Sequence, residues 1–228
     1  MSAGTELPEA ARFLGSLADG ARRGEFLVPR EEDPRAPRPG AGGPRRSAVL
    51  LLIAGTGLED AALVLEERGH ALRSQPGQFS LPGGGIDADD PSPVHAALRE
   101  AHEETGLHPA EVEVLGAFAP IPMPWRDQRV TPVLGWAPRR PRLGVQDPVE
   151  VERVVWAPLR GPGSLTDPDR RFRGALGDRA VGPVFDLPDG VFVWGFTAMI
   201  LDRVLTELGL EGTPPGVPTV QIPPAFRR

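Results

Sequence analysis

Three glutamates and a run of three glycines stand at a spacing that could build one chemical site. The glycines are Gly83, Gly84 and Gly85, and the glutamates are Glu100, Glu103 and Glu104. At 100° per residue, a helix places the three glutamates on one face. Glu100 and Glu104 are then an i,i+4 like-charge pair, which is unfavourable by a few tenths of a kcal/mol. A solvated acidic face is one interpretation, but it does not account for the neighbouring glycines.

A hard divalent cation is the other interpretation of this pattern. Mg²⁺ and Mn²⁺ prefer carboxylate, carbonyl and water oxygens. A glycine loop can bring a backbone carbonyl close to the ion because no side chain obstructs it. Such an ion neutralises phosphoryl oxygens and lowers the pKa of a bound water, and a nearby carboxylate can take the water's proton. The pattern therefore favours hydrolysis of a phosphoanhydride.

The helix that must carry the glutamates is well marked. Ser92 is a good N-cap and Pro93 suits the first helical position, while Gly106 is a typical helix end. The sequence therefore predicts a helix over 92–105. Its apolar stripe would consist of Val94, Ala97, Leu98 and Ala101.

Apolar runs bounded by turn residues predict a mixed set of strands and helices, an α+β fold. We expect strands at 48–54, 61–68, 78–84, 111–121 and 129–138, and a strand or short helix at 150–159. An amphipathic helix is expected within 192–210 and a short helical pattern within 4–28. Residues 160–180 read as loop-rich, and the proline-rich tail from 212 onward reads as irregular.

The composition narrows the class of protein. The 228 residues include no cysteine, which excludes disulfides and thiolate chemistry, and carry a net charge of −6. All 25 basic residues are arginine, so a phosphate-binding lysine is excluded. The acidic balance predicts no nucleic-acid partner. The absence of a long apolar run or a secretory signal predicts no membrane partner and a cytoplasmic location.

The segment Arg99–Leu107, REAHEETGL, resembles the second half of the Nudix box, G-x5-E-x7-R-E-U-x-E-E-x-G-U, at every specified position. The first half departs, because Pro91 stands where the box has glutamate. Reading from Gly84 instead places Asp90 at that position, with one residue inserted.

That departure resembles the coenzyme A pyrophosphatase branch of the Nudix hydrolases. Its L-R-x-H-x-G-Q-x-x-F-P-G-G-x-x-D-x-x-D pattern is similar to residues 72–90, except that Gln75 replaces the histidine and Leu81 the phenylalanine. Residues 130–133 and 193–198 are also similar to segments of that branch. The resemblance covers roughly residues 47–210.

The resemblance implies a Nudix-type α/β/α sandwich with a mixed β-sheet and a dependence on Mg²⁺ or Mn²⁺. It implies cleavage of coenzyme A (CoA) or acyl-CoA to 3′,5′-ADP and (acyl-)4′-phosphopantetheine. The chain would divide into an N-terminal extension and linker (1–46), the Nudix domain (47–210) and a proline-rich tail (211–228). The partner would be a small nucleotide, and the oligomeric state stays open, a homodimer included.

The resemblance also assigns roles to the residues of the site. Glu100 and Glu104 would be metal ligands, and Glu103 would be a ligand or act close to the metal-bound water. The backbone of Gly84 would complete the metal site, and Arg99 would orient the glutamates through charge-assisted hydrogen bonds. Two further residues would contact the substrate, namely Arg73 and Gln78.

Residues outside the glutamate cluster also have expected roles. Asp87 and Asp90 are expected to serve as turn and cap residues. Three histidines on or just past the helix are expected to be solvent-exposed rather than catalytic: His95, His102 and His108. Trp125 and Arg126 lie in a loop between strands, where an adenine could stack. Trp194 and Phe196 are expected to pack in the core.

Two rival functions stay open at this point. Gln75 favours a Nudix hydrolase of another nucleoside diphosphate derivative, such as ADP-ribose or a dinucleoside polyphosphate. A Nudix-fold binding module without catalysis is the second rival, and the intact acidic face counts against it.

Overall fold

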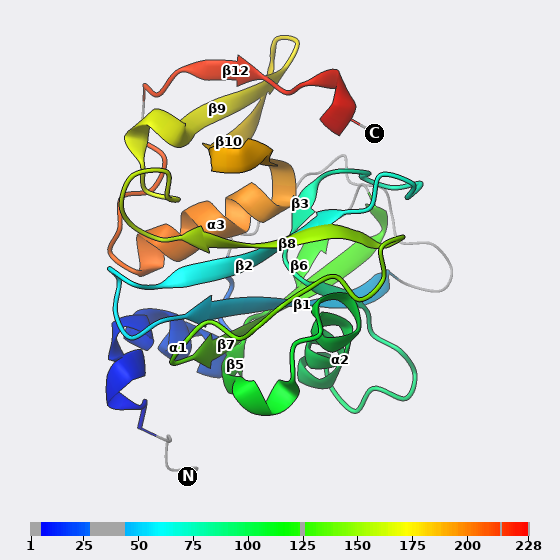
Figure 1. Ribbon diagram of the computed structural model, residues 1–228, viewed down its shortest axis with the longest axis vertical. Coiled ribbons are helices and arrows are strands. Elements are labelled where there is room, and N and C mark those ends of the chain that lie inside the picture. Colours follow the sequence, from blue (N-terminus) through cyan, green and yellow to red (C-terminus); the bar gives the residue numbers. More distant parts are fainter. Residues whose placement is uncertain (1–5, 28–43, 124–125, 215, 228) are drawn as a thin grey trace.

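The fold is built around strand β1 (Arg45–Ala54), the central strand of an eight-stranded mixed sheet (Figure 1). The computed structural model describes residues 6–27, 44–123, 126–214 and 216–227. β1 runs parallel to β7 (Gln128–Ala137) and antiparallel to β2 (Ala62–Arg68). The sheet order is β3-β2-β1-β7-β5, while β4 pairs with β1, β6 with β7 and β8 with β2. These further strands are β3 (Phe79–Ser80), β4 (Gly83–Gly85), β5 (Glu113–Ala117), β6 (Ile121–Met123) and β8 (Val151–Pro158).

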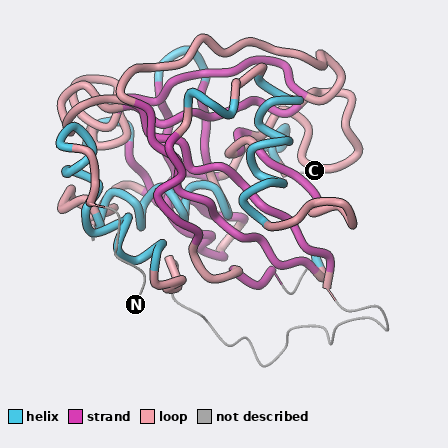
Figure 2. Tube along the Cα trace, turned by 90° about the horizontal axis from the view of Figure 1, so that it is seen from below, coloured by secondary structure: helices cyan, strands magenta, loops and turns pink. Residues whose placement is uncertain are grey.

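Helices cover both faces of this sheet, which explains why β1 is apolar at every position from Ala48 to Ala54. Successive side chains of a strand point to opposite faces. Leu51 and Ile53 pack with helices α1 (Gly15–Arg22) and α3 (Gly195–Glu207), while Leu50 and Leu52 pack with α2 (Pro93–Thr105). Figure 2 shows strands passing between helical segments on either side. The predicted α+β fold, an α/β/α sandwich with a mixed sheet, is confirmed.

The helix that carries the glutamates begins and ends as predicted. The Oγ of Ser92 accepts a hydrogen bond from the backbone N–H of His95 at 3.2 Å, and Pro93 occupies the first turn. Gly106 ends the helix with a φ of 71°, a conformation that glycine adopts without steric cost. Local sequence therefore determines where α2 begins and ends.

A second sheet contradicts two of the sequence predictions. It has the order β11-β10-β9-β12, with β9 (Arg171–Leu176), β10 (Arg179–Leu187), β11 (Val191–Val193) and β12 (Thr219–Gln221). The region 160–180 is therefore not simply loop-rich, because Gly177 and Asp178 form the tight connection of the β9–β10 hairpin. The tail is not irregular throughout either. β12 forms by parallel pairing with β9, a distant contact that local patterns do not reveal.

A buried arginine ties this second sheet to α3 and to the tail. The Nη1 of Arg171 donates to the carbonyl oxygen of Glu211 at 2.6 Å, and its Nη2 donates to Asp202 on α3 at 3.1 Å. Its guanidinium also lies 5.7 Å from the ring centroid of Phe185. The chain beyond α3 is therefore anchored through a charge-assisted network, and it passes back toward β3 in Figure 1.

The remaining differences concern element boundaries. The segment 150–159, expected to be a strand or a short helix, contains the strand β8. The expected strand 78–84 is divided into β3 and β4, and the expected strand 111–121 into β5 and β6. The N-terminal helical pattern is a 3₁₀ helix, Glu9–Leu14, followed by α1. Shorter 3₁₀ turns lie at Pro109–Glu111, Pro168–Arg170, Pro188–Gly190 and Pro224–Phe226. Among the described residues, no helix combines the length and apolar character needed to cross a bilayer.

Candidate metal and diphosphate site

The glycine run packs directly against the glutamates of α2. A Cβ on Gly84 would lie 2.5 Å from the carboxylate of Glu100, so only glycine leaves room for that side chain. Gly83 has a φ of 149°, and a Cβ there would lie 2.3 Å from the carbonyl oxygen of Ala48. Its backbone N–H donates to the Oε2 of Glu104 at 2.8 Å. The structure thus brings together two glycines and two glutamates that the sequence separates by a loop and a helix turn.

The three glutamates differ sharply in exposure. Glu104 is 6% exposed, the side chain of Glu100 is 17% exposed, and that of Glu103 is 57% exposed. A solvated acidic face would leave all three in water, so that interpretation is wrong for Glu104. Burying an ionised carboxylate is costly unless it is paired or coordinates a metal. Glu100 and Glu104 therefore lie at the glycine loop, where a bound cation or a proton would stabilise their buried carboxylates.

A fourth carboxylate belongs to this cluster and was not predicted. Glu66 on β2 is 1% exposed, its Oε1 accepts a hydrogen bond from the Oγ of Ser80 at 3.2 Å, and its Oε2 is buried without a partner in the described part of the chain. The signal was present in the sequence. Glu66 follows Ala62 and Val64 at alternate positions of an apolar strand, so it had to point into the protein on the α2 side.

Burial and mutual repulsion raise the pKa values of this cluster. Burial is the main cause for Glu104, whose pKa rises well above its usual range, and the neighbouring Glu66 adds to the shift. Burial also raises the pKa of Glu66, partly opposed by its hydrogen bond to Ser80. The pKa of Glu100 is raised by burial and lowered in part by Arg99. Two carboxyls that interact strongly titrate as a pair, so the upward shifts belong to Glu66 and Glu104 together.

These raised pKa values have a measurable consequence for stability. A carboxyl whose pKa is raised in the folded state binds a proton that the unfolded chain has already lost, so stability falls as pH rises from the unfolded pKa to the folded pKa. In EDTA, the melting temperature should therefore drop by several degrees between pH 6 and pH 9. Differential scanning calorimetry tests this, with Glu104→Gln as the matched variant in which the drop should shrink. An equal drop in wild type and variant would contradict the assignment.

Arg99 holds the outer part of the cluster. Its Nη1 lies 3.0 Å from Glu100 and 3.1 Å from Glu103, and its Nη2 donates to the carbonyl oxygen of Gly85 at 3.0 Å. The same group donates to Asp90 at 2.9 Å, and this bond is the main reason why the pKa of Asp90 is lowered. Arg99 thus contacts two of the glutamates and the glycine run, and its orienting role stays a prediction.

The loop before the helix is held by Asp90, as its predicted turn role requires. Asp90 accepts a hydrogen bond from the backbone N–H of Asp87 at 2.9 Å and lies 2.7 Å from the Nδ1 of His95. His95, His102 and His108 are exposed, as expected.

The residues fit a hard divalent cation, although no three acidic or histidine side chains of the described chain are already gathered around one metal position. Arg99 and the N–H of Gly83 hold the carboxylates in their present places. The donor set consists of carboxylate and backbone oxygens, the chemistry that Mg²⁺ and Mn²⁺ prefer. Gly84 has no side chain and therefore leaves space beside the carboxylate of Glu100. The unpartnered oxygen of Glu66 is a further oxygen that could bind the metal.

The two residues predicted to bind substrate lie on the loop that precedes the glycines. Arg73 is exposed, and the described contacts do not join it to the carboxylates. Gln78 is buried, and its Nε2 donates to the carbonyl oxygen of Phe226 at 2.8 Å. Its Oε1 accepts a hydrogen bond from the Nε2 of Gln75 at 3.2 Å. Gln78 therefore binds the C-terminal segment, whose Phe226 ring stacks on Phe192 at 5.2 Å.

Two aromatic predictions have different outcomes. Phe196 is partly buried and packs against the core, as expected, and Trp194 is partly buried. Trp125 lies outside the described residues, so the predicted adenine contact there stays a prediction. Its neighbour Arg126 is half-buried and donates to the Oγ of Ser74 at 3.3 Å.

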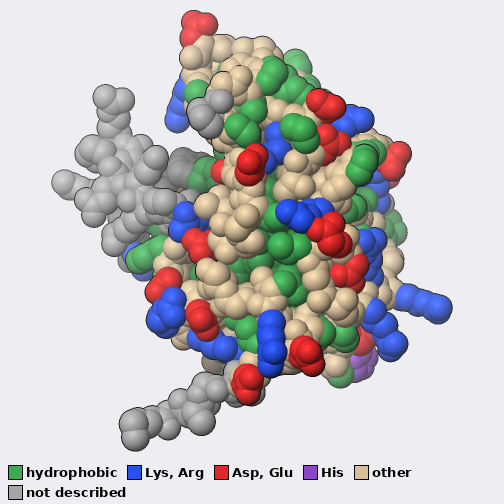
Figure 3. Space-filling model, turned by 90° about the vertical axis from the view of Figure 1, so that its left-hand side faces the viewer, with side chains coloured by type: hydrophobic (Ala, Val, Ile, Leu, Met, Phe, Trp, Pro, Cys, Tyr) green, Lys and Arg blue, Asp and Glu red, His purple; other side chains and the backbone are tan. Residues whose placement is uncertain are grey.

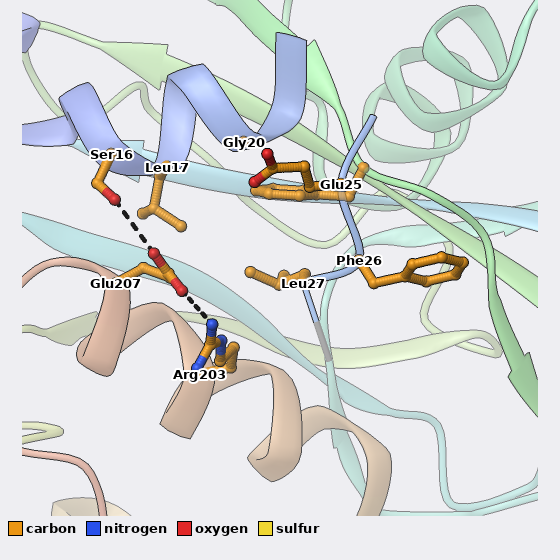
Figure 4. Close-up of a pocket in the computed structure, with 9 residues that line it drawn as sticks. Ser16, Leu17, Gly20, Glu25, Phe26, Leu27, Arg203 and Glu207 are labelled. Carbon is orange, nitrogen blue, oxygen red and sulfur yellow. Dashed lines mark hydrogen bonds and ion pairs between the residues drawn. The ribbon is translucent and has the colours of Figure 1, made fainter. Parts of the chain in front are cut away.

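A cavity elsewhere in the molecule is too small to be the substrate site. It lies between α1 and α3 and has a volume of about 40 Å³ (Figure 4). Ligand pockets usually have several hundred Å³, whereas this space suits a water molecule or two. Ser16 donates to Glu207 across it at 3.1 Å, and Glu207 also pairs with Arg203. These contacts join the two helices, and the space-filling view in Figure 3 shows acidic and basic side chains interspersed on that side of the molecule.

Comparison with known proteins agrees with this fold. The NUDIX domain family model matches residues 44–173, more than half of the chain and all of the acidic cluster. The chain is 32% identical over 208 residues to Nudix hydrolase 15, mitochondrial, of Arabidopsis thaliana, covering 89% of this chain and 66% of that protein. It is 34% identical over 170 residues to "Uncharacterized Nudix hydrolase NudL" of Enterobacter sp. (strain 638), covering 73% of this chain and 84% of that protein. The chain thus spans about two thirds of the plant relative and more of the bacterial one.

Solved structures of the same family are also similar. A NUDIX hydrolase from Nitrosomonas europaea aligns over 87% of this chain and 96% of its own, at 14% identity and a TM-score of 0.47. The Nudix hydrolase RenU from M. smegmatis aligns over 50% of this chain and 70% of its own, at 28% identity and a TM-score of 0.41. The family match and the relatives above 30% identity establish the class. The chain belongs to the NUDIX family and is a Nudix hydrolase, an enzyme of the diphosphatase class.

Proposed function

We propose that this chain hydrolyses the diphosphate bond of CoA or acyl-CoA, in a reaction that depends on Mg²⁺ or Mn²⁺. The observation that carries the proposal is the packing of the buried carboxylates of Glu100 and Glu104 against Gly83 and Gly84. Nudix hydrolases generally use divalent metal ions and act on small nucleotide derivatives. The products would be 3′,5′-ADP and (acyl-)4′-phosphopantetheine.

The residues of the cluster take distinct roles in this proposal. Glu100 and Glu104 hold the metal with the backbone of Gly84. When bound, the ion supplies charge neutralisation at the phosphoryl oxygens and a bound water of lowered pKa. Glu103, the most exposed of the three, is either a further ligand or the group that accepts the proton of that water. Arg99 keeps Glu100 and Glu103 in place through its Nη1.

Glu66 adds a role that the family motif does not contain. Burial holds the pKa values of Glu66 and Glu104 above their usual range, and deprotonation makes both carboxylates available as metal donors. Because metal ligands must be deprotonated, metal affinity is expected to rise with pH through the range in which the pair titrates.

The choice of CoA within the family is supported by the segment 72–90. Its glycine, glutamine and aspartate pattern resembles that of the CoA pyrophosphatase branch. Arg73 and Gln78 of this segment are proposed to contact substrate. The Gln78 amide is turned toward Phe226, so the C-terminal segment lies beside the proposed substrate path.

A hydrolase of another nucleoside diphosphate derivative, such as ADP-ribose, is the second candidate. Gln75 favours it, because a glutamine in the left-handed conformation, with a φ of 55°, stands where the CoA branch has histidine. A substrate panel separates the two. CoA, acetyl-CoA, ADP-ribose and a dinucleoside tetraphosphate are incubated with Mg²⁺, Mn²⁺ or EDTA, and the products are separated by chromatography. Preferred cleavage of CoA or acetyl-CoA supports the proposal, whereas cleavage of ADP-ribose alone would replace it with the second candidate.

Gln75 is expected to act by positioning Gln78. Its side chain donates one hydrogen bond to Gln78, and the net worth of such a bond is about 0.5–1.5 kcal/mol. Gln75→Ala should therefore raise KM roughly 2–10-fold with a smaller change in kcat, while Gln75→His keeps a ring N–H donor and should stay near wild type. Steady-state kinetics on the preferred substrate gives the answer. A KM for Gln75→Ala equal to that of wild type would exclude this positioning role.

The cellular location and the oligomeric state stay predictions. Relatives are named mitochondrial and chloroplastic, so their names do not select the cytoplasm for this chain. The small-nucleotide partner follows from the proposed reaction, and the absence of a nucleic-acid or membrane partner is kept as predicted from the sequence.

A further inference from the structure

Three arginines from separate segments converge beside the carboxylate cluster. Arg45 begins β1, Arg68 ends β2 and Arg126 precedes β7. The Nη2 of Arg45 donates to the backbone carbonyl oxygen of Arg126 at 3.1 Å. Arg126 in turn donates to the Oγ of Ser74, and the backbone of Arg68 bonds to Gly77 and Gln78. These contacts, together with the repulsion that Arg68 and Arg45 exert on Arg126, bring the three arginines together beside the loop that leads into the glycine run.

These arginines are not neutralised by acidic side chains in direct contact. Within the part of the chain that the structure describes, none of the three forms an ion pair within 4.0 Å. The pKa of Arg126 is lowered, first by burial and then by the positive charges of Arg68 and Arg45. Arg68 and Arg126 are half-buried and Arg45 is exposed. Like charges gathered in this way repel one another, and a bound anion would relieve that repulsion. The acidic cluster would be stabilised by a cation. In the same way, the three arginines would be stabilised by an anion.

Arg68 supplies the second and independent observation. Its Nε is buried and has no hydrogen-bond partner among the described residues. A buried donor left unsatisfied costs about 1–3 kcal/mol, and a bound anion would remove that cost. A planar guanidinium suits a phosphate oxygen because it offers several N–H groups in a fixed fork.

The arginines adjoin the proposed metal site. Arg68 lies two residues beyond Glu66 on the same strand, and its charge opposes the rise in the pKa of Glu66. A strand rises about 3.3 Å per residue, so the two backbone positions are about 7 Å apart. Arg68 therefore lies close enough to the acidic cluster for one substrate to contact both.

We infer that Arg45, Arg68 and Arg126 form an anion subsite that binds a phosphate group of the substrate. The inference rests on the proposed function and deepens it, because it assigns the substrate's negative charge to named residues outside the Nudix box. The phosphate has two possible sources. It is either part of the diphosphate that is cleaved or a phosphate monoester elsewhere on the nucleotide, such as the 3′-phosphate of CoA.

Equilibrium binding without metal tests the subsite apart from catalysis. Isothermal titration calorimetry in EDTA measures the Kd of 3′,5′-ADP for wild type, Arg126→Gln and Arg68→Met. The matched control is Arg179→Gln, which removes an exposed arginine from β10 of the second sheet. A charge-assisted bond is worth about 1.5–3 kcal/mol, so either site variant should weaken binding roughly 10–100-fold while the control stays at the wild-type value. Melting curves confirm that each variant is folded.

Kinetics with metal then identifies the source of the phosphate. If Arg126→Gln raises KM more for CoA than for dephospho-CoA, the subsite binds the monoester; an equal rise assigns it to the diphosphate. Unchanged Kd and KM in both site variants, or no binding of 3′,5′-ADP by wild type, would overturn the inference. Failure of the proposed function looks different, because anion binding would persist in EDTA while CoA and acyl-CoA remain uncleaved in Mg²⁺ or Mn²⁺.

Discussion

Glu104→Gln is expected to lower kcat by about 10²–10⁴-fold, the range associated with losing a positioned catalytic group, while the protein stays folded. The amide oxygen of glutamine can still accept the N–H of Gly83, which Glu104 binds at 2.8 Å. Its neutral amide also removes the charge repulsion with Glu66. What the variant loses is the negative charge that a divalent cation would require.

The control for this prediction is Glu111→Gln, which removes the same charge from an exposed residue just beyond α2. Steady-state kinetics with saturating Mn²⁺ measures kcat, and circular dichroism measures folding. Activity of Glu104→Gln within a few-fold of the control would show that Glu104 is not a ligand. In EDTA above pH 8, the variant should even be more stable than wild type, because it buries no carboxyl at that position.

Gly84→Ala is expected to weaken Mn²⁺ binding by roughly 10–100-fold, comparable to the loss when a group that orients a metal ligand is removed. The added Cβ would lie 2.5 Å from the carboxylate of Glu100, closer than real Cβ atoms approach other atoms. The carboxylate of Glu100 must then move away from its present position beside Gly84. The effect should fall on metal affinity first and on activity as its consequence.

Gly85→Ala is the matched control, because the neighbouring glycine has open space where its Cβ would be built. Electron paramagnetic resonance of free Mn²⁺ gives the Kd of both variants, and melting curves give their stability. Comparable Mn²⁺ affinity in the two variants would mean that Gly84 does not border the metal. A loss of stability confined to Gly84→Ala, with unchanged metal affinity, would assign it a packing role instead.

The parts of the site that the sequence could predict are those fixed by local contacts. Ser92 and Gly106 mark the ends of α2 through their own hydrogen bond and backbone conformation, so the relative placement of Glu100 and Glu104 followed from helical spacing. The need for glycine before the helix also followed, since a carboxylate beside the loop leaves no room for a Cβ.

The missing parts depend on contacts between distant segments. Glu66 meets Glu104 only after β2 takes its place beside β1, and no local pattern announces that pairing. The bond from Gln78 to Phe226 joins residues 148 positions apart. Phe226 follows β12, which forms only by parallel pairing with the distant strand β9. The arginine subsite was not predicted as a group for the same reason, although Arg126 alone was noted as a possible ligand contact.

Metal-dependent hydrolysis of a diphosphate at this acidic cluster can be measured with isotopically labelled water. CoA is incubated with the enzyme and Mn²⁺ in H₂¹⁸O, and the products are analysed by mass spectrometry, with EDTA and Glu104→Gln as parallel samples. We expect 3′,5′-ADP and 4′-phosphopantetheine, with one ¹⁸O in one of the two new phosphate groups. The samples with EDTA or with Glu104→Gln should contain almost none of either product. Intact CoA in the presence of Mn²⁺, or equal product formation in EDTA, would contradict this expectation.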